Sequence, residues 1–141
     1  MKPVTLSANG CTAMNAGINL ALDKLKERIR LYNEYGNPCF KPWVVMITDG
    51  CSTDDVSEAA SRIRKAEARK FLKFWSVGTS GYDLATLVKL STKPRVLELP
   101  NNDYVSFFDW ISENILGMQC SPMISVELPK NIYSIKIEKN K

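Results

Sequence analysis

Histidine is missing from all 141 residues of this chain. Without an imidazole, neither Ser-His-Asp nor Cys-His catalysis can be assembled within it. The four cysteines form no CxxC pair, so a zinc site is not expected. No apolar run approaches the roughly 18 residues of a membrane span, and the N-terminal MKPVTLSANG lacks the apolar core of a secretory signal. These absences predict a cytoplasmic protein with reduced, mostly packed thiols.

The composition is that of an ordinary globular chain, with 45% hydrophobic and 24% charged residues. Its length suits one domain spanning residues 1–141. The net charge is +4, and basic residues are dense only in segments 24–30 and 62–73, each with an interleaved glutamate. We interpret both segments as solvated helix faces, because a nucleic-acid site needs a concentrated stripe. Neither nucleic acid nor membrane is expected as a partner.

The central stretch, PWVVMITDGCSTDD, covers residues 42–55. Its apolar, β-branched first half, 43–48, is typical of a strand buried inside a parallel sheet. The strand leads into Asp49, Gly50, two hydroxyl residues and the Asp54-Asp55 pair. Open α/β folds place ligands at this carboxyl end, and hard oxygen donors suit Mg²⁺ or Mn²⁺. The alternative is a plain connecting loop in which Ser52, Thr53 or Asp54 caps the next helix.

Helical and strand patterns alternate along the rest of the chain. Apolar spacing predicts a long helix with Thr12 at its N-cap or just before it, and a last helix capped by Asp103 or Asn102. The apolar residues of that last helix expected on its buried side are Val105, Phe108, Trp110, Ile111 and Ile115. The predicted helices are 13–35, 56–70, 83–90 and 104–116, the strands are 43–48, 71–77 and 95–99, and a terminal hairpin joins 123–128 to 132–137. Strands separated by helices predict an α/β fold with a narrow, mostly parallel sheet.

Several of these motifs occur together in one known family. Residues 12–17 before a long helix, then Ile-Thr-Asp-Gly with Thr-Asp-Asp in segment 47–55, then 75–78, resemble a von Willebrand factor type A domain of the bacterial tellurite-resistance and stress-associated type. The resemblance runs over about residues 6–129. It implies a doubly wound, mostly parallel sheet with helices on both faces. It also implies a metal-ion-dependent adhesion site in which Thr12 and Asp49 are ligands of Mg²⁺ or Mn²⁺.

The sequence departs from that family at one important place. The family's Asp-x-Ser-x-Ser motif, which supplies the principal metal ligands, has no counterpart in this chain, so the implied adhesion site is partial. The strand that carries the motif in the family lies beside the counterpart of 43–48. We therefore expect strand 43–48 to have an unpaired apolar edge, open to another chain. That chain is a second copy or a separate N-terminal half, unless the terminal hairpin covers the edge.

Three functions follow as alternatives. The first is a non-catalytic protein-interaction module that binds a protein partner at the carboxyl edge of the sheet, where the partial metal site lies. The second is a metal-dependent phosphoryl-transfer or hydrolytic enzyme using Asp49, Asp54 and Asp55. The third is a truncated gene product without independent function. Cys11 and Cys51 lie near the candidate loops, either as packing residues or as a redox-sensitive pair.

Overall fold

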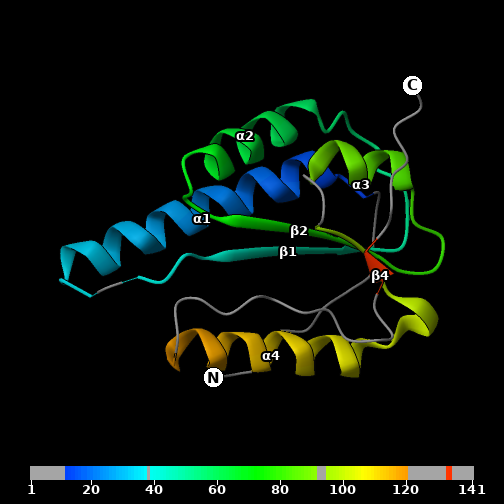
Figure 1. Ribbon diagram of the computed structural model, residues 1–141. Helices are drawn as coiled ribbons and strands as arrows, with labels where there is room; N and C mark the ends of the chain where they lie inside the picture. Colours follow the sequence, from blue (N-terminus) through cyan, green and yellow to red (C-terminus); the bar gives the residue numbers. More distant parts are fainter. Residues whose placement is uncertain (1–11, 38, 92–94, 121–132, 135–141) are drawn as a thin grey trace, which may run out of the picture.

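A computed structural model describes residues 12–37, 39–91, 95–120 and 133–134, and these form a parallel sheet with helices on both faces (Figure 1). The elements in chain order are α1 (Met14–Glu34), β1 (Trp43–Thr48), α2 (Ser57–Ala68), β2 (Lys73–Gly78), α3 (Leu84–Leu90), β3 (Val96–Glu98), the 3-10 helix η1 (Pro100–Asn102), α4 (Tyr104–Cys120) and β4 (Tyr133–Ser134). The predicted α/β class is confirmed, and the arrangement is consistent with a Rossmann-like fold.

The sheet has the strand order β1-β2-β3-β4. Strand β1 pairs in parallel with β2 from Trp43 opposite Lys73 to Thr48 opposite Gly78, and β2 pairs in parallel with β3. The predicted bounds of β1 are confirmed residue for residue. In this order β1 is an edge strand whose partner within the described sheet is β2 alone. The numbers of the described strands increase in one direction across the sheet. A doubly wound sheet also extends in the opposite direction, so that part of the predicted fold stays a prediction.

The predicted terminal hairpin is not supported. Its first strand, 123–128, lies outside the described residues. The described part of its second strand, Tyr133–Ser134, is β4 and pairs antiparallel with Glu98 and Leu97 of β3. The apolar alternation near the C-terminus therefore predicted a strand correctly, but it could not reveal that the strand adds to the main sheet.

One core lies between the sheet and the helices α1, α2 and α3. Ile18 and Leu22 of α1, Ile63 of α2 and Phe74 of β2 are buried in it. The apolar residues of α1 recur every three or four positions, and this spacing places them on the single face that meets the sheet. The long predicted helix is thus confirmed.

A second core lies on the opposite face, under α4, and contains all three tryptophans. The ring centroids of Trp43, Trp75 and Trp110 lie 5.3 to 5.9 Å apart. Phe107 is fully buried beside Trp110. The prediction for this helix was wrong at three positions, since Val105, Phe108 and Ile115 are exposed. Docking Trp110 onto the other two indoles fixes the rotation of α4, and that rotation turns the three aliphatic and aromatic residues outward.

Two of the helices end in the same way. At α1, Gly36 adopts a positive φ of 69°, its N–H donates to the Asn33 carbonyl, and Asn37 N–H donates to the Tyr32 carbonyl. At α2, Lys70 takes the equivalent place with a φ of 56°, and its N–H donates to the Glu67 carbonyl. These are Schellman motifs, and the Gly36 stop signal was readable from the sequence. Within the described ranges, no helix has the length and apolar character needed to cross a membrane.

Candidate functional site

The predicted ligand Asp49 lies at the carboxyl end of β1, and its side chain is exposed. The preceding residue, Thr48, receives the Gly50 N–H on its hydroxyl at 3.3 Å and so shapes the start of the loop. Gly81, with a φ of 96°, passes so close that a β-carbon there would lie 2.9 Å from the Asp49 carbonyl oxygen. Within the described part of the chain, the Asp49 carboxylate makes no hydrogen bond or ion pair, so it is open to solvent.

The other predicted ligand, Thr12, lies just before the N-cap of α1, which is Ala13. Its side chain is exposed, while its carbonyl accepts hydrogen bonds from the N–H groups of Met14 and Thr53, both at 3.0 Å. The bond from Thr53 ties the start of α1 to the acidic loop. The structure therefore brings the start of α1, which carries Thr12, to the loop that follows Asp49.

Asp54 was predicted either to belong to an acidic metal-binding loop or to cap the following helix, and the structure shows a different role. Its carboxylate accepts the N–H groups of Asn15 at 3.0 Å and Ala16 at 3.1 Å, and the hydroxyl of Ser52 at 2.6 Å. It thus caps α1, the preceding helix, rather than α2, the following one. The Ser52 hydroxyl and the two backbone N–H groups lower the pKa of Asp54. These three donors engage both oxygens and occupy most of the acceptor positions of the Asp54 carboxylate.

The start of α2 is completed from α1 in return. The side-chain carbonyl of Asn15 accepts the Ala59 N–H at 2.9 Å, across 44 residues of sequence. The N-cap of α2 itself, Val56, has no capping side chain. Asp55 precedes the helix and accepts the N–H and hydroxyl of Ser57, which lower the pKa of Asp55. Each of the two helices therefore begins on a side chain that belongs to the other segment.

Further along the same interface, Arg62 of α2 reaches α1. Its guanidinium donates to the side chain of Asn19 at 2.9 Å and forms an ion pair with Asp23. No local sequence pattern indicates the pairs Asp54–Asn15, Asn15–Ala59 or Arg62–Asn19. An asparagine in the first turn of a helix usually bonds locally, and its bond to a second helix is visible only in three dimensions.

The loop does not present a closed metal site. In the described ranges, no group of three or more histidine, cysteine, aspartate and glutamate side chains is placed to hold a metal ion. Thr12 and Asp49 offer one hydroxyl and one carboxylate, a set that Mg²⁺ would have to complete with water or with a partner's oxygen. Their role as ligands therefore stays a prediction.

The cysteines provide little more. Cys39 and Cys51 are free and exposed, so the expectation of packed thiols was wrong for these two residues. Cys11, the proposed companion of Cys51, lies outside the described residues.

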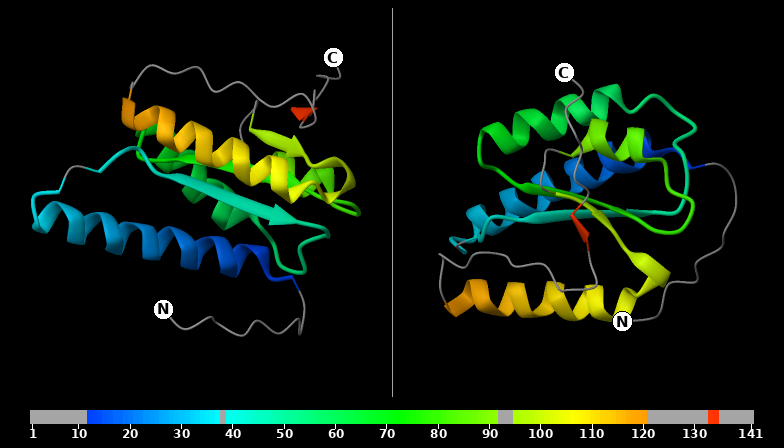
Figure 2. Two further views of the ribbon diagram at one scale, coloured as in Figure 1. Left: turned by 90° about the horizontal axis from the view of Figure 1, so that it is seen from below. Right: turned by 45° about the vertical axis from the view of Figure 1, so that its right-hand side comes forward.

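A second candidate feature is the open edge of β1. A groove of about 240 Å³ runs along this strand and is lined by Val44 to Thr48 and by Gly17, Ile18 and Ala21 of α1. Figure 2 (left) shows α1 lying beyond β1, on the side away from β2. Small residues on α1 thus leave space beside the strand, under the helix.

The backbone direction of β1 identifies the groups that face this groove. The carbonyl of Pro42 accepts the Lys73 N–H, and the carbonyl of Thr48 accepts the Thr79 N–H. The main-chain N–H and C=O groups of the even-numbered residues of β1 therefore point toward β2. In a parallel strand the N–H and C=O groups of alternate residues point to opposite sides. The main-chain groups of Trp43, Val45 and Ile47 therefore point away from β2, and Val45 and Ile47 line the groove.

Comparisons with known proteins identify no relative. A scan against models of protein families, a search of curated proteins and a search of solved structures each returned no match.

Proposed function

We propose that this chain is a non-catalytic protein-interaction module, similar to a von Willebrand factor type A domain, whose sheet is extended by a strand from a partner protein beside β1. The observation that carries the proposal is the geometry of this edge. Two outward-facing residues of an apolar strand, Val45 and Ile47, border a groove of about 240 Å³, and α1 lies over the place where one further strand would pair. Strand addition of this kind draws its affinity from main-chain hydrogen bonds.

The groove suits a single extended segment better than a second copy of the chain. If two copies paired through β1, their β1 strands would lie about 4.8 Å apart. Two packed helices need about 8–10 Å between their axes. Two copies related by a two-fold axis at this edge would each bring an α1 that extends beyond its own β1. Each α1 would then occupy the space over the other copy's sheet, where α1 and α2 already pack. An extended segment without a covering helix avoids this clash.

The test is an amide-exchange and titration experiment on the whole chain. In the free protein the Val45 and Ile47 amides should exchange fast, while those of Val44 and Met46 are protected by β2. Synthetic peptides of alternating valine and threonine, with terminal lysines for solubility, should protect the two outward amides. Slow exchange of Val45 and Ile47 in the monomeric chain alone, or a stable homodimer by light scattering, would contradict the proposal.

Proline substitutions give a matched pair of variants. Ile47→Pro removes an outward N–H, which an edge strand tolerates, so the protein should fold but lose peptide binding. Met46→Pro removes an N–H that faces β2 and should unfold the sheet. If Ile47→Pro folds and still binds the peptides with unchanged affinity, strand addition is excluded.

The acidic loop supports the non-catalytic part of the proposal. Backbone N–H groups engage both oxygens of Asp54 and one oxygen of Asp55, which gives both carboxylates a structural role near a helix start. Thr12 and Asp49 keep exposed oxygens on two segments that are tied together by the Thr53–Thr12 hydrogen bond. We propose that they bind Mg²⁺ or Mn²⁺ weakly, with a partner's carboxylate completing the coordination.

The metal part of the proposal has its own test. Calorimetric titration with millimolar Mn²⁺ should release or absorb heat in the wild-type chain, and Asp49→Asn should abolish the signal. Asp55→Asn, which changes the same charge in the same loop, should leave the signal in place. A titration of the wild-type protein without heat at millimolar metal would remove the metal from the proposal and leave the strand-addition site standing.

A further inference from the structure

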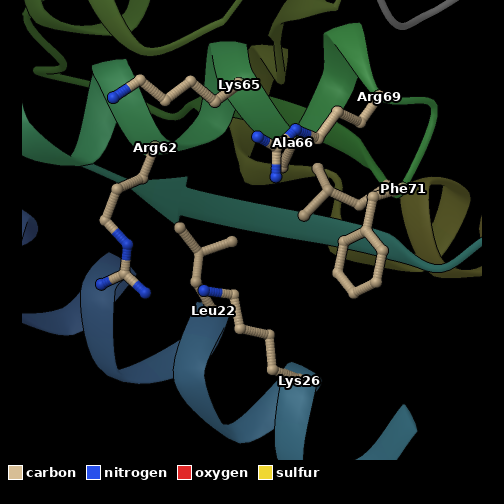
Figure 3. Close-up of a pocket in the computed structure, with 8 residues that line it drawn as sticks. Leu22, Lys26, Arg62, Lys65, Ala66, Arg69 and Phe71 are labelled. Carbon is tan, nitrogen blue, oxygen red and sulfur yellow. The ribbon is translucent and has the colours of Figure 1, made fainter. Parts of the chain in front are cut away.

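The two basic segments of the sequence meet around a groove between α1 and α2. This groove has a volume of about 380 Å³, and Figure 3 shows the side chains that line it. Its floor is apolar and consists of Leu22, Ala66, Phe71 and Leu72, of which Leu22 and Leu72 are buried. It shares no lining residue with the groove along β1. The sequence showed the two segments as separate solvated faces, and the fold places them side by side.

Four cations surround this apolar floor. Lys26 comes from α1, whereas Arg62, Lys65 and Arg69 come from α2 and its end. In Figure 3, Lys26 and Arg69 reach from opposite helices over the apolar floor. Asp23, the carboxylate beside the groove, is already held by Arg62. Arg62 lowers the pKa of the Asp23 carboxyl most, and Lys26 contributes to this only at longer range. In the described ranges Lys26, Lys65 and Arg69 form no ion pair, so their charge is available to a ligand.

Glu67, in the same turn of α2, does not offset this charge. Its carboxylate accepts the Phe74 N–H at 3.0 Å and pairs with Arg95 at 2.8 Å, on the side of α2 that faces the sheet. Cations at the end of a helix complement the helix dipole, and this effect alone would explain Lys65 and Arg69. It does not explain why Lys26 of a different helix faces them over an apolar floor.

We propose that this groove binds a small amphipathic anion: a carboxylate or phosphate head carrying an unbranched aliphatic tail. The volume lies within the range of small-molecule sites. The apolar floor accounts for the tail, because burying aliphatic carbon against Leu22 and Phe71 removes it from water. The flexible lysines and the planar Arg69 guanidinium account for the head, because charge-assisted hydrogen bonds to carboxylate or phosphate are the strong ones.

The test titrates the whole chain with octanoate or octyl phosphate. Binding is measured by calorimetry and by amide chemical shifts. Both probes should bind and shift the amides of Leu22, Ala66 and Phe71. Acetate and inorganic phosphate, which lack the tail, and octanol, which lacks the charge, should bind at least about tenfold more weakly. Raising the salt concentration should weaken the binding of octanoate, since the cations are solvent-accessible.

Matched variants locate the site. Lys26→Gln with Arg69→Gln should reduce octanoate affinity about tenfold or more. Lys24→Gln with Arg28→Gln, which removes the same charge from exposed positions of α1 outside the groove, should leave the affinity unchanged. Unfolding curves of all variants show whether each one is folded. Equal binding of octanol, equal binding of inorganic phosphate, or unchanged octanoate affinity in the folded Lys26→Gln/Arg69→Gln variant would each overturn the proposal.

Binding only to anionic vesicles, with no response to monomeric octanoate or octyl phosphate, would also overturn it, because the site would then be a membrane-surface patch. Failure of this site would leave the strand-addition proposal untouched, since the two grooves have no lining residue in common.

Discussion

Asp54 holds the first turn of α1 from a loop almost forty residues further along the chain. Its three donors, Ser52, Asn15 and Ala16, all stabilise the charged form, which is why its pKa is lowered. The helix would otherwise start on Ala13, which has no side chain able to accept a hydrogen bond. A single carboxylate therefore joins the acidic loop to the first helix, and its protonation should loosen that junction.

We expect Asp54→Asn to destabilise the protein at neutral pH, because one amide oxygen replaces two carboxylate oxygens. A pKa lowered on folding stabilises the native state above the unfolded-chain value of about 3.9, and this stabilisation is lost as the pH falls through the folded value. The difference in unfolding free energy between the two proteins should thus shrink at about pH 3. Urea unfolding at both pH values measures it, with Asp49→Asn as the control. A difference independent of pH would contradict the assigned role.

A second polar contact lies inside the core. The hydroxyls of Ser76 on β2 and Ser91 after α3 are 2.6 Å apart, and both residues are buried. Ser91→Ala should cost about 1–2 kcal/mol, because it leaves the Ser76 hydroxyl without this partner. The double variant to alanine should cost less than the sum of the two single changes, since it removes both polar groups together. Urea denaturation of the four proteins in a double-mutant cycle measures the coupling, and strict additivity would show that the hydroxyls do not interact.

At the level of elements, α4 is attached to the sheet through Trp110. Its ring packs against Trp43, Trp75 and Phe107 and is 5% exposed. Trp110→Ala should lower the free energy of unfolding by about 3–5 kcal/mol, as large-to-small changes of buried aromatics do. Val105→Ala, on the exposed face of the same helix, should change it by less than about 0.5 kcal/mol. Far-ultraviolet circular dichroism during urea titration provides the measurement, and equal effects of the two changes would contradict the observed rotation of α4.

The backbone at the end of α2 is strained at one residue, and a substitution there can relieve the strain. Lys70 has a φ of 56°, a conformation that costs an L-residue with a β-carbon more than it costs glycine. Lys70→Gly should therefore raise the unfolding free energy by about 0.5–1 kcal/mol. Lys65→Gly, at a helical position in the last turn of α2, should lower it by up to about 1 kcal/mol. Thermal unfolding of the two variants would give shifts of opposite sign, and a destabilising Lys70→Gly would show that the lysine side chain contributes more than the strain costs.

The elements themselves were largely predictable, and their mutual contacts were not. The apolar run of β1, the periodicity of α1 and the stop signal at Gly36 are local patterns, and local patterns determined these bounds. The cap on α3 was also local, because Asp83 bonds to Ala85 and Thr86 a few residues away. The exposed side of α4 was predicted wrongly, because its rotation depends on indoles of two other elements.

For the candidate site, the sequence predicted the loops but not the partners of their side chains. The resemblance implies that Thr12 and Asp49 belong to one site, and the Thr53–Thr12 bond joins the start of α1 to the loop after Asp49. The capping of α1 by Asp54 and of α2 by Asn15 joins residues about forty positions apart. Contacts of that separation follow from how the helices pack on the sheet, and no short-range pattern encodes them.

At the level of the whole molecule, the open edge of β1 is also a place where the chain can aggregate. The segment WVVMIT carries no charge and no proline, and it ends at an edge where Ile47 is 37% exposed. Ile47→Lys places a charge on this edge, a device by which natural sheets avoid edge-to-edge association. We expect both proteins to be monomeric in dilute solution, and we expect the wild type to aggregate more readily than the variant as the protein concentration rises, because an unpaired apolar edge is an aggregation site. Light scattering over a concentration series measures this, and identical behaviour of both proteins would show that association does not use β1.

The tryptophan cluster also determines which events are visible in the emission of this protein. All three indoles lie in the layer under α4, within 6 Å of one another, and the layer that holds α1, α2 and α3 contains none. Emission therefore reports the release of α4 from the sheet and is nearly blind to the separation of α1 from α2. Far-ultraviolet ellipticity, to which the long helix α1 contributes strongly, follows the opposite layer. Whether the two signals change at the same denaturant concentration will show if both faces of the sheet unfold as one unit.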